Sequence, residues 1–142
     1  MTQDKSLRSF TIGERYDVAV RMVRIALARE GLRVPAEVDI TARLRQELGA
    51  MVAPSVILFV DDPALLLEAV VFNRGAGLQI PQPLVVCGGH PNTRVILRSA
   101  DPCNADVPET IRDPVLSLQR RMTKALETIA DRQDAPLSVA LP

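Results

Sequence analysis

The sequence predicts an α+β fold, in which an antiparallel sheet carries long helices packed on one face. Three observations predict it. Hydrophobic residues recur at a helical spacing before Gly31 and at every second position after it. A short apolar run ends at Asp62-Pro63, a pair typical of a helix start. Two later apolar runs flank Gly88-Gly-His-Pro-Asn92, which is rich in turn residues. This mixture of hairpins and helices favours α+β over a doubly wound parallel sheet.

The first part of the chain contains a strand, a helix and a second strand. Residues 7–12 alternate well enough for a strand. Apolar residues at helical spacing predict a helix over about 14–30, with Gly31 as its C-terminal cap. Residues 32–40 then alternate between apolar and other side chains, which predicts a half-buried strand. Because Pro35 cannot donate a ladder hydrogen bond, we expect this strand at an edge or bulged at that position.

The central part alternates helix and strand. Residues 41–48 form a short predicted helix that Gly49 ends. The continuous apolar run 55–60 fits a strand that is buried on both faces or lies next to the sheet centre. A helix then begins at Asp62-Pro63 and is expected to end at the glycines of 75–77. We expect it to present a buried face made of Leu66, Leu67, Val70 and Val71.

The last part contains a hairpin and a long helix. Residues 84–87 and 93–98 are the two predicted hairpin strands, and 99–112 is a predicted loop. Asp113-Pro114 repeats the pair that starts a helix, so a long amphipathic helix is expected over about 113–132. The tail 134–142 is apolar enough to pack against another surface.

Length and charge limit the classes of protein. The 142 residues, 47% of them hydrophobic, suit one domain over 1–142 whose core needs neither metal nor disulfide. Seventeen basic residues balance seventeen acidic ones, which argues against a nucleic-acid or anionic-membrane partner. The N-terminus is polar, and no apolar run approaches the roughly 18 residues of a membrane span. We therefore expect a cytoplasmic protein with reduced thiols and no cofactor.

The order and spacing of several short motifs resemble domain-of-unknown-function family 302. The motifs are Glu30-Gly-Leu32, Val38-Asp39, Glu47-Leu-Gly49, Asp62-Pro-Ala64, Gly77-Leu-Gln-Ile-Pro81 and Ala100-Asp-Pro102. The resemblance covers roughly residues 7–102. It implies a TATA-binding-protein-like fold, with an antiparallel sheet and long helices on one side. That fold does not by itself imply DNA binding.

Two tripeptides depart from the pattern of that family. Many members have Cys-Asn-Pro where this chain has Asp61-Asp62-Pro63, and Leu-Pro-Cys where this chain has Ile80-Pro81-Gln82. Both typical cysteines are therefore missing. The resemblance implies no established activity, and thiol or soft-metal chemistry at those two positions does not transfer to this chain.

Cys87 and His90 are the metal-ligand candidates in the sequence. Thiolate and imidazole bind zinc or copper, and a Cys-x-x-His spacing at a hairpin can reach one ion. A site needs three or four ligands, however. We favour the alternative that Cys87 is a small buried strand residue and His90 an exposed turn residue.

The ligand-binding candidates are three carboxylates and one amide. Asp61 and Asp62 sit where a strand becomes a helix, and such a pair can bind a hard cation or share a proton. Asp39 ends a strand before the short helix and could act as a base. Helix capping or a solvated turn is the simpler role for all three. Gln82, beside two prolines, could line a pocket or belong to a stiff connection.

Three functions remain open from the sequence. The first is a non-catalytic domain that binds a small ligand in an aliphatic pocket between helices and sheet. The second, compatible with the first, is a homodimer that buries the apolar face of the last helix and the tail. The alternative is a metal-binding protein or a carboxylate-dependent enzyme that uses Asp39, Asp61 and Asp62.

Overall fold

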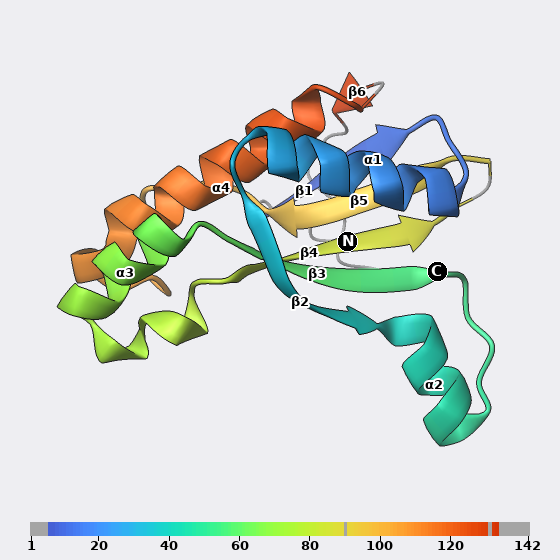
Figure 1. Cartoon of the computed structure of the whole chain (residues 1–142), viewed down its shortest axis with the longest axis horizontal. Coiled ribbons are helices and arrows are strands. Elements are labelled where there is room, and N and C mark those ends of the chain that lie inside the picture. The colour runs from blue at the N-terminus through green and yellow to red at the C-terminus, as the bar shows by residue number, and fades with distance from the viewer. Residues whose placement is uncertain (1–5, 90, 131, 134–142) are drawn as a thin grey trace.

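In the computed structural model, the chain forms one antiparallel sheet with helices on one face (Figure 1). The structure describes residues 6–89, 91–130 and 132–133. The elements are β1 Leu7–Ile12, α1 Tyr16–Arg29, β2 Arg33–Asp39, α2 Ile40–Leu48, β3 Ser55–Asp61, α3 Pro63–Phe72, η1 Arg74–Leu78, β4 Gln82–Gly88, β5 Thr93–Arg98, η2 Glu109–Ile111, α4 Arg112–Glu127 and β6 Arg132–Gln133. The predicted α+β class and antiparallel sheet are confirmed. The tail 134–142 lies outside the described residues.

The strand order is β2-β3-β4-β5-β1-β6, and every neighbouring pair is antiparallel. The sequence prediction for β2 is confirmed twice. The strand lies at the edge of the sheet, and its pairing with β3 shifts register between Arg33 and Ala36. Pro35 lies inside that shift. It has no N–H to donate to β3, and because β2 is an edge strand, no strand on its other side needs that N–H.

Local residues fix the ends of the helices near β2 and β3. Gly31 follows α1 with φ +76°, and Gly49 follows α2 with φ +64°, a left-handed backbone that favours glycine. Asp39 caps α2 by accepting a hydrogen bond from the Ala42 N–H at 2.9 Å. Asp62 caps α3 in the same way, accepting from the Ala64 N–H at 2.9 Å.

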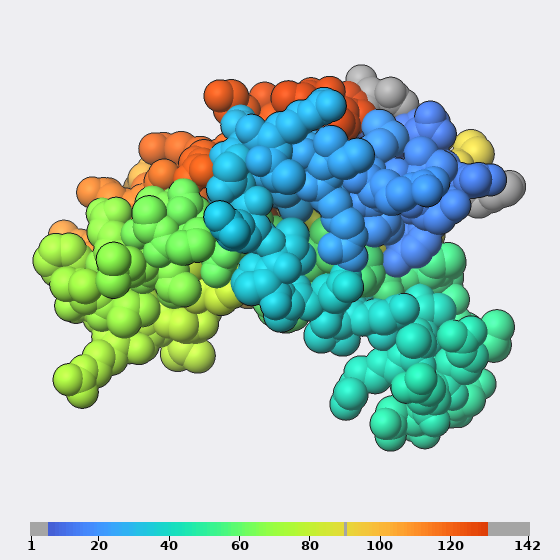
Figure 2. Space-filling model, in the orientation of Figure 1, coloured from blue at the N-terminus to red at the C-terminus, as the bar shows by residue number. Residues whose placement is uncertain are grey.

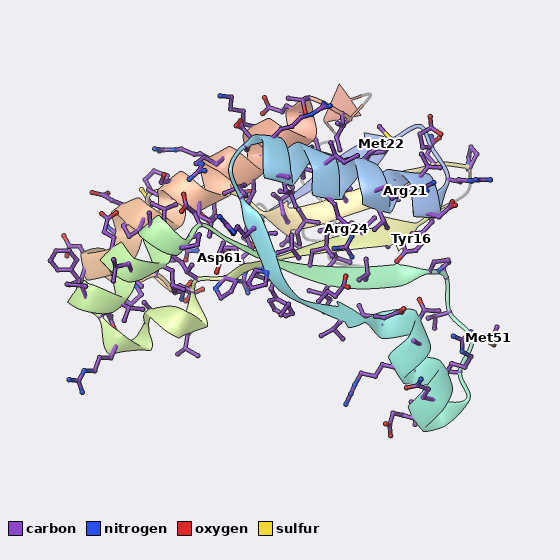
Figure 3. All side chains as sticks on the ribbon, in the orientation of Figure 1. Tyr16, Arg21, Met22, Arg24, Met51 and Asp61 are labelled. Carbon is purple, nitrogen blue, oxygen red and sulfur yellow. The ribbon has the colours of Figure 1, made fainter. Side chains whose placement is uncertain are left out.

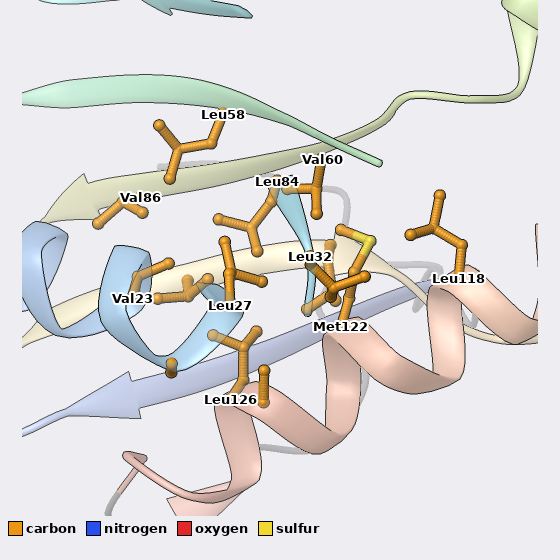
Figure 4. Packing of buried hydrophobic residues seen from close by; sticks show 14 of the residues in the cluster. Val23, Leu27, Leu32, Leu58, Val60, Leu84, Val86, Leu118, Met122 and Leu126 are labelled. Carbon is orange, nitrogen blue, oxygen red and sulfur yellow. The ribbon is translucent and has the colours of Figure 1, made fainter. Parts of the chain in front are cut away.

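The core lies between one face of the sheet and the helices α1 and α4 (Figure 4). Strand residues alternate in burial, so Val56, Leu58 and Val60 of β3 face the core while the residues between them are half-buried. Strand β3 is therefore interior to the sheet but is not buried on both faces. Helix α4 covers this core with its predicted apolar face, including Leu118, Met122 and Ala125. That face is buried within the domain.

Two predictions about helices were wrong. Leu67, Val70 and Val71 of α3 are exposed, whereas Leu66 packs partly buried against the core and Ala69 is fully buried. Apart from Glu68, the residues of helix α3 are apolar, so the sequence has no polar face that indicates which side meets the core.

The second error concerns the start and end of α4. The helix begins at Arg112, one residue before Asp113, and Ile111 occupies the N-cap position. Asp113 therefore lies in the first turn rather than at the cap. The helix ends at Glu127, earlier than expected from the apolar pattern. Within the described residues, no helix is long and apolar enough to cross a membrane.

Candidate functional site

A cleft of about 480 Å³ opens between α1 and β2. That volume lies within the range of small-molecule sites in proteins. In the space-filling view, the surfaces of α1 and α2 stand on either side of a hollow on this side of the molecule (Figure 2). The cleft is lined by Tyr16, Asp17, Val20, Arg24, Glu37, Asp39 and Val56.

Helix α1 supplies one wall. Tyr16, Val20 and Arg24 are spaced four residues apart, so they form a single stripe along the helix. All three are half-buried. Figure 3 shows Tyr16 and Arg24 on the side of α1 that faces β2. The stripe lies beside the fully buried positions of the same helix, so the cleft continues the edge of the core.

Strand β2 supplies the opposite wall, and β3 supplies the base. Glu37 and Asp39 are two residues apart and therefore share one face of the strand. Their partners in the register are Leu58 and Val56, which face the core, so both carboxylates lie on the helix side of the sheet. Val56 places an aliphatic surface beneath them. Because β2 is an edge strand, this acidic wall meets solvent.

The cleft carries an excess of negative charge. Its lining holds three carboxylates, from Asp17, Glu37 and Asp39, and one guanidinium, from Arg24. Arg24 forms an ion pair with Glu37 across the cleft. Asp17 is paired with Arg15 at 2.9 Å, and both of these side chains are well exposed. The carboxylate of Asp39 uses its Oδ1 atom in the helix cap.

The pKa of Tyr16 is shifted by its surroundings in the cleft. Burial raises the pKa of its phenol, and the negative charge of Asp39 raises it further, while Arg24 opposes the shift. The hydroxyl is therefore protonated at neutral pH. It can donate one hydrogen bond and accept another inside the cleft.

The remaining predicted carboxylates lie elsewhere. Asp39 pairs with Val56, five residues before Asp61 along β3, which corresponds to about 17 Å of strand. Asp61 lies at the α3 end of the molecule, away from Tyr16 (Figure 3). Asp39, Asp61 and Asp62 therefore do not form one carboxylate cluster.

Asp61 and Asp62 have opposite environments. Burial raises the pKa of Asp61, and the charge of Asp62 adds to the shift while Arg33 opposes it. The Arg121 side chain, followed by the Ala64 backbone N–H, holds the pKa of Asp62 below its usual range. Arg121 bonds the Asp62 carboxylate at 2.5 Å and the Glu30 carbonyl at 2.6 Å. The Asp62 carboxylate is therefore bound both by the Ala64 N–H and by the Arg121 side chain.

Gln82 belongs to a buried network of amides. Its carbonyl accepts a hydrogen bond from Gln119 Nε2 at 3.2 Å, and its own Nε2 donates to the Gln79 carbonyl at 2.5 Å. Gln82 and Gln119 are both buried. These bonds satisfy polar groups that would otherwise be costly inside the core. Gln82 thus joins β4 to α4 and does not line the cleft.

The proposed Cys87–His90 pair falls partly outside the described residues, because His90 is not among them. Cys87 is half-buried in β4, its thiol lies 3.7 Å from the Arg94 carbonyl, and burial raises its thiol pKa. In the part of the chain that the structure describes, no three His, Cys, Asp or Glu side chains are placed to hold a metal.

Of the predicted site residues that the structure describes, the cleft contains Asp39 alone. The sequence reasoning missed Tyr16, Asp17, Arg24 and Glu37. The sequence does contain a pattern that points to the acidic wall, since Glu37 and Asp39 are two residues apart in β2 and so share one face of the strand. What the sequence did not supply was the position of α1 over that face.

The chain is similar to known proteins in sequence and in structure. A family model described as "Domain of unknown function DUF302" matches residues 8–129, a range that includes α4. No curated protein matches the chain. The crystal structure of an uncharacterized conserved protein DUF302 from Bacillus stearothermophilus is similar, with a TM-score of 0.77 and 17% sequence identity. The match covers 87% of this chain and 98% of that chain. At this identity, the likeness concerns the fold.

Proposed function

The chain belongs to the DUF302 family, a domain of unknown function, and within that family we propose that it is a non-catalytic binding domain for a small organic cation. The cleft between α1 and β2 is the site of this function. The single observation that carries the proposal is a hollow of about 480 Å³ in which carboxylates surround an aliphatic base. A primary amine with a short aliphatic chain matches both features.

The charge of the lining selects the sign of the ligand. Arg24 offsets Glu37, and Arg15, which does not line the cleft, offsets Asp17. The charge of Asp39 is left as the net negative charge of the site. A bound ammonium group gains charge-assisted hydrogen bonds from such a wall, whereas a carboxylate ligand is repelled. Burial is the main cause of the raised pKa of Tyr16, and the negative charge of Asp39, which adds to it, also attracts a bound cation.

The apolar lining selects the body of the ligand. Val20 and Val56 provide aliphatic surface, and Tyr16 adds an aromatic ring with a polar tip. An alkyl chain placed there leaves water at about 25 cal/mol per Å² of buried surface. The ligand is therefore amphipathic, with its cationic end at β2 and its alkyl body toward α1.

Matched probes test the proposal. Hexylamine and hexanoate have the same alkyl length and opposite charge, and each can be titrated calorimetrically against the full chain at neutral pH. We expect hexylamine to bind and hexanoate to fail. The Asp39→Asn variant keeps a good N-cap and removes the charge, so the fold is retained while amine affinity falls about tenfold or more. Glu47→Gln on α2 makes the same charge change outside the cleft and leaves affinity unchanged.

Two results would overturn the proposal. One is equal binding of the amine and the carboxylate, or no binding of either up to about 10 mM, a limit of roughly −3 kcal/mol. The other is unchanged amine affinity in Asp39→Asn. Chemical conversion of the amine by the wild-type chain, lost in the same variant, would instead support the carboxylate-dependent enzyme.

A further inference from the structure

Helix α3 and η1 expose an apolar surface at one end of the molecule (Figure 2). We define the α3 patch as the exposed side chains Leu67, Val70, Val71, Phe72 and Leu78. Val71 is 70% exposed, Phe72 68% and Leu78 86%. A helix whose residues are almost all apolar is ordinarily buried, whereas α3 contacts its own domain mainly through α4 and η1 and leaves much of its apolar surface exposed.

The size of the α3 patch fits the centre of a protein interface. Its five side chains expose about 500 Å² of apolar surface, if each contributes on the order of 100 Å². A standard interface buries about 800 Å² on each partner, and its core is richer in apolar area than its rim. The patch therefore supplies the apolar core of such an interface, with the surrounding polar residues as the rim.

We propose that the α3 patch is occupied by the α3 patch of a second copy of this chain, related by a two-fold axis near Val71. The charges beside the patch support this occupant. Glu68 lies three residues before Val71, and Arg74 lies three residues after it, and both are exposed. Glu68 lies on α3 and Arg74 on η1, beyond the extended residue Asn73. A two-fold contact of the patch with its own copy can set Glu68 beside Arg74 of the partner subunit, and the symmetry then forms this pair twice.

The self-contact brings no like charges together. Glu68 is the charged residue of α3, and the neighbouring Arg74 balances it, so the patch has no net charge to repel its own copy. A partner recognised by charge would face a patch with no excess of either sign. The chain therefore carries both halves of the proposed contact, apolar core and complementary rim, on one continuous segment.

A second exposed apolar site lies at the tip of α2. It consists of Leu48, Met51 and Val52, and Met51 is 81% exposed. Figure 1 places α2 and α3 at opposite ends of the molecule. A contact between an α3 patch and a neighbour's α2 tip would be head-to-tail, and such a contact produces rings or open chains of molecules rather than a two-fold dimer. The size of the assembly therefore distinguishes the two arrangements.

The experiment is sedimentation equilibrium of the full chain over a wide concentration range. The wild type is expected to be a dimer. Val71→Asp places a charge at the centre of the contact and is expected to weaken dimerisation by about tenfold or more. Met51→Asp is the matched control, since it makes an equally polar change at an equally exposed site, and the dimer is expected to persist. Circular dichroism checks that each variant is folded.

Exchanging the charges of Glu68 and Arg74 tests whether these two residues face each other across the contact. This test does not require that the Val71→Asp variant folds. Glu68→Arg alone and Arg74→Glu alone are each expected to weaken the dimer, because each creates two like-charge pairs. The double variant Glu68→Arg/Arg74→Glu restores the pairs and is expected to recover dimerisation. A wild type that stays monomeric, a series of growing oligomers, or a dimer insensitive to both Val71→Asp and the single exchanges would each overturn the proposal.

Discussion

Arg121 is predicted to contribute to stability by joining three elements that are far apart in the sequence. From α4 it bonds the Asp62 carboxylate that caps α3 and the Glu30 carbonyl at the end of α1. The Arg121 side chain is 31% exposed and the Asp62 side chain 20%. The Arg121→Met variant keeps most of the aliphatic body and removes both hydrogen bonds.

The expected loss follows from these two bonds. A buried hydrogen bond to a charged group contributes about 1.5–3 kcal/mol, and partial exposure reduces that value through solvent screening. We therefore expect Arg121→Met to lower the free energy of unfolding by about 2 kcal/mol. For a domain of this size, that corresponds to a decrease in Tm of roughly 7 °C.

Urea unfolding monitored by circular dichroism measures this loss. Arg120→Met is the control, because Arg120 is exposed on the same helix, and its loss is expected to stay within about 0.5 kcal/mol. The slope of the unfolding transition should remain that of the wild type, since the surface exposed on unfolding does not change.

The difference between wild type and Arg121→Met should also depend on pH. The Arg121 side chain holds the pKa of Asp62 below its ordinary value of 3.8 in the folded protein. A lowered carboxyl pKa gives stability that is present above pH 3.8 and is lost as the pH falls through the folded-state pKa. The reasoning would be refuted if Arg121→Met matched Arg120→Met, or if its loss were the same at neutral and strongly acidic pH.

Two further predictions concern single residues of the fold. Burial raises the pKa of Asp61 above 3.8, so its ionised carboxylate costs stability at neutral pH. Asp61→Asn is expected to raise Tm at pH 7, and the gain should vanish as the pH falls toward 3.8; a lower Tm at pH 7 would contradict this. Gly31→Ala and Gly49→Ala both place a side chain at positive φ, which costs about 1–2 kcal/mol each. Chemical denaturation should show the larger loss at Gly31, where a Cβ lies 3.3 Å from an α4 side-chain nitrogen, than at Gly49, where nothing lies within 4 Å; equal losses would contradict the steric part of the argument.

Elements with a polar face or a breaker residue could be predicted from the sequence. The change of period at Gly31 marked the junction of α1 and β2, and the backbone there adopts a left-handed conformation. Pro35 indicated an edge or a bulge, and β2 has both. These predictions succeeded because each rests on a local property of the backbone that tertiary contacts do not override.

Features that depend on tertiary placement could not be predicted in the same way. An apolar helix such as α3 satisfies the pattern of a buried face in every rotation, so the exposure of Val71 required the position of α4. Tyr16 and Val20 share the helical spacing of the core, and the sequence does not show that they stand at its open edge. The cleft exists because α1 crosses the sheet beside the edge strand β2. The position of α1 over the sheet comes from the packing of α1 and α4 against it.

Native mass spectrometry of the full chain tests the central claim most directly. The wild-type protein and Asp39→Asn, titrated with hexylamine under the same conditions, should differ in the fraction of molecules that carry the added mass. We expect one hexylamine for each wild-type chain, lost on denaturation and strongly reduced in Asp39→Asn. Equal occupancy in the two proteins, or retention of hexanoate at the same level as hexylamine, would contradict the assignment of the cleft between α1 and β2 as a cation-binding site.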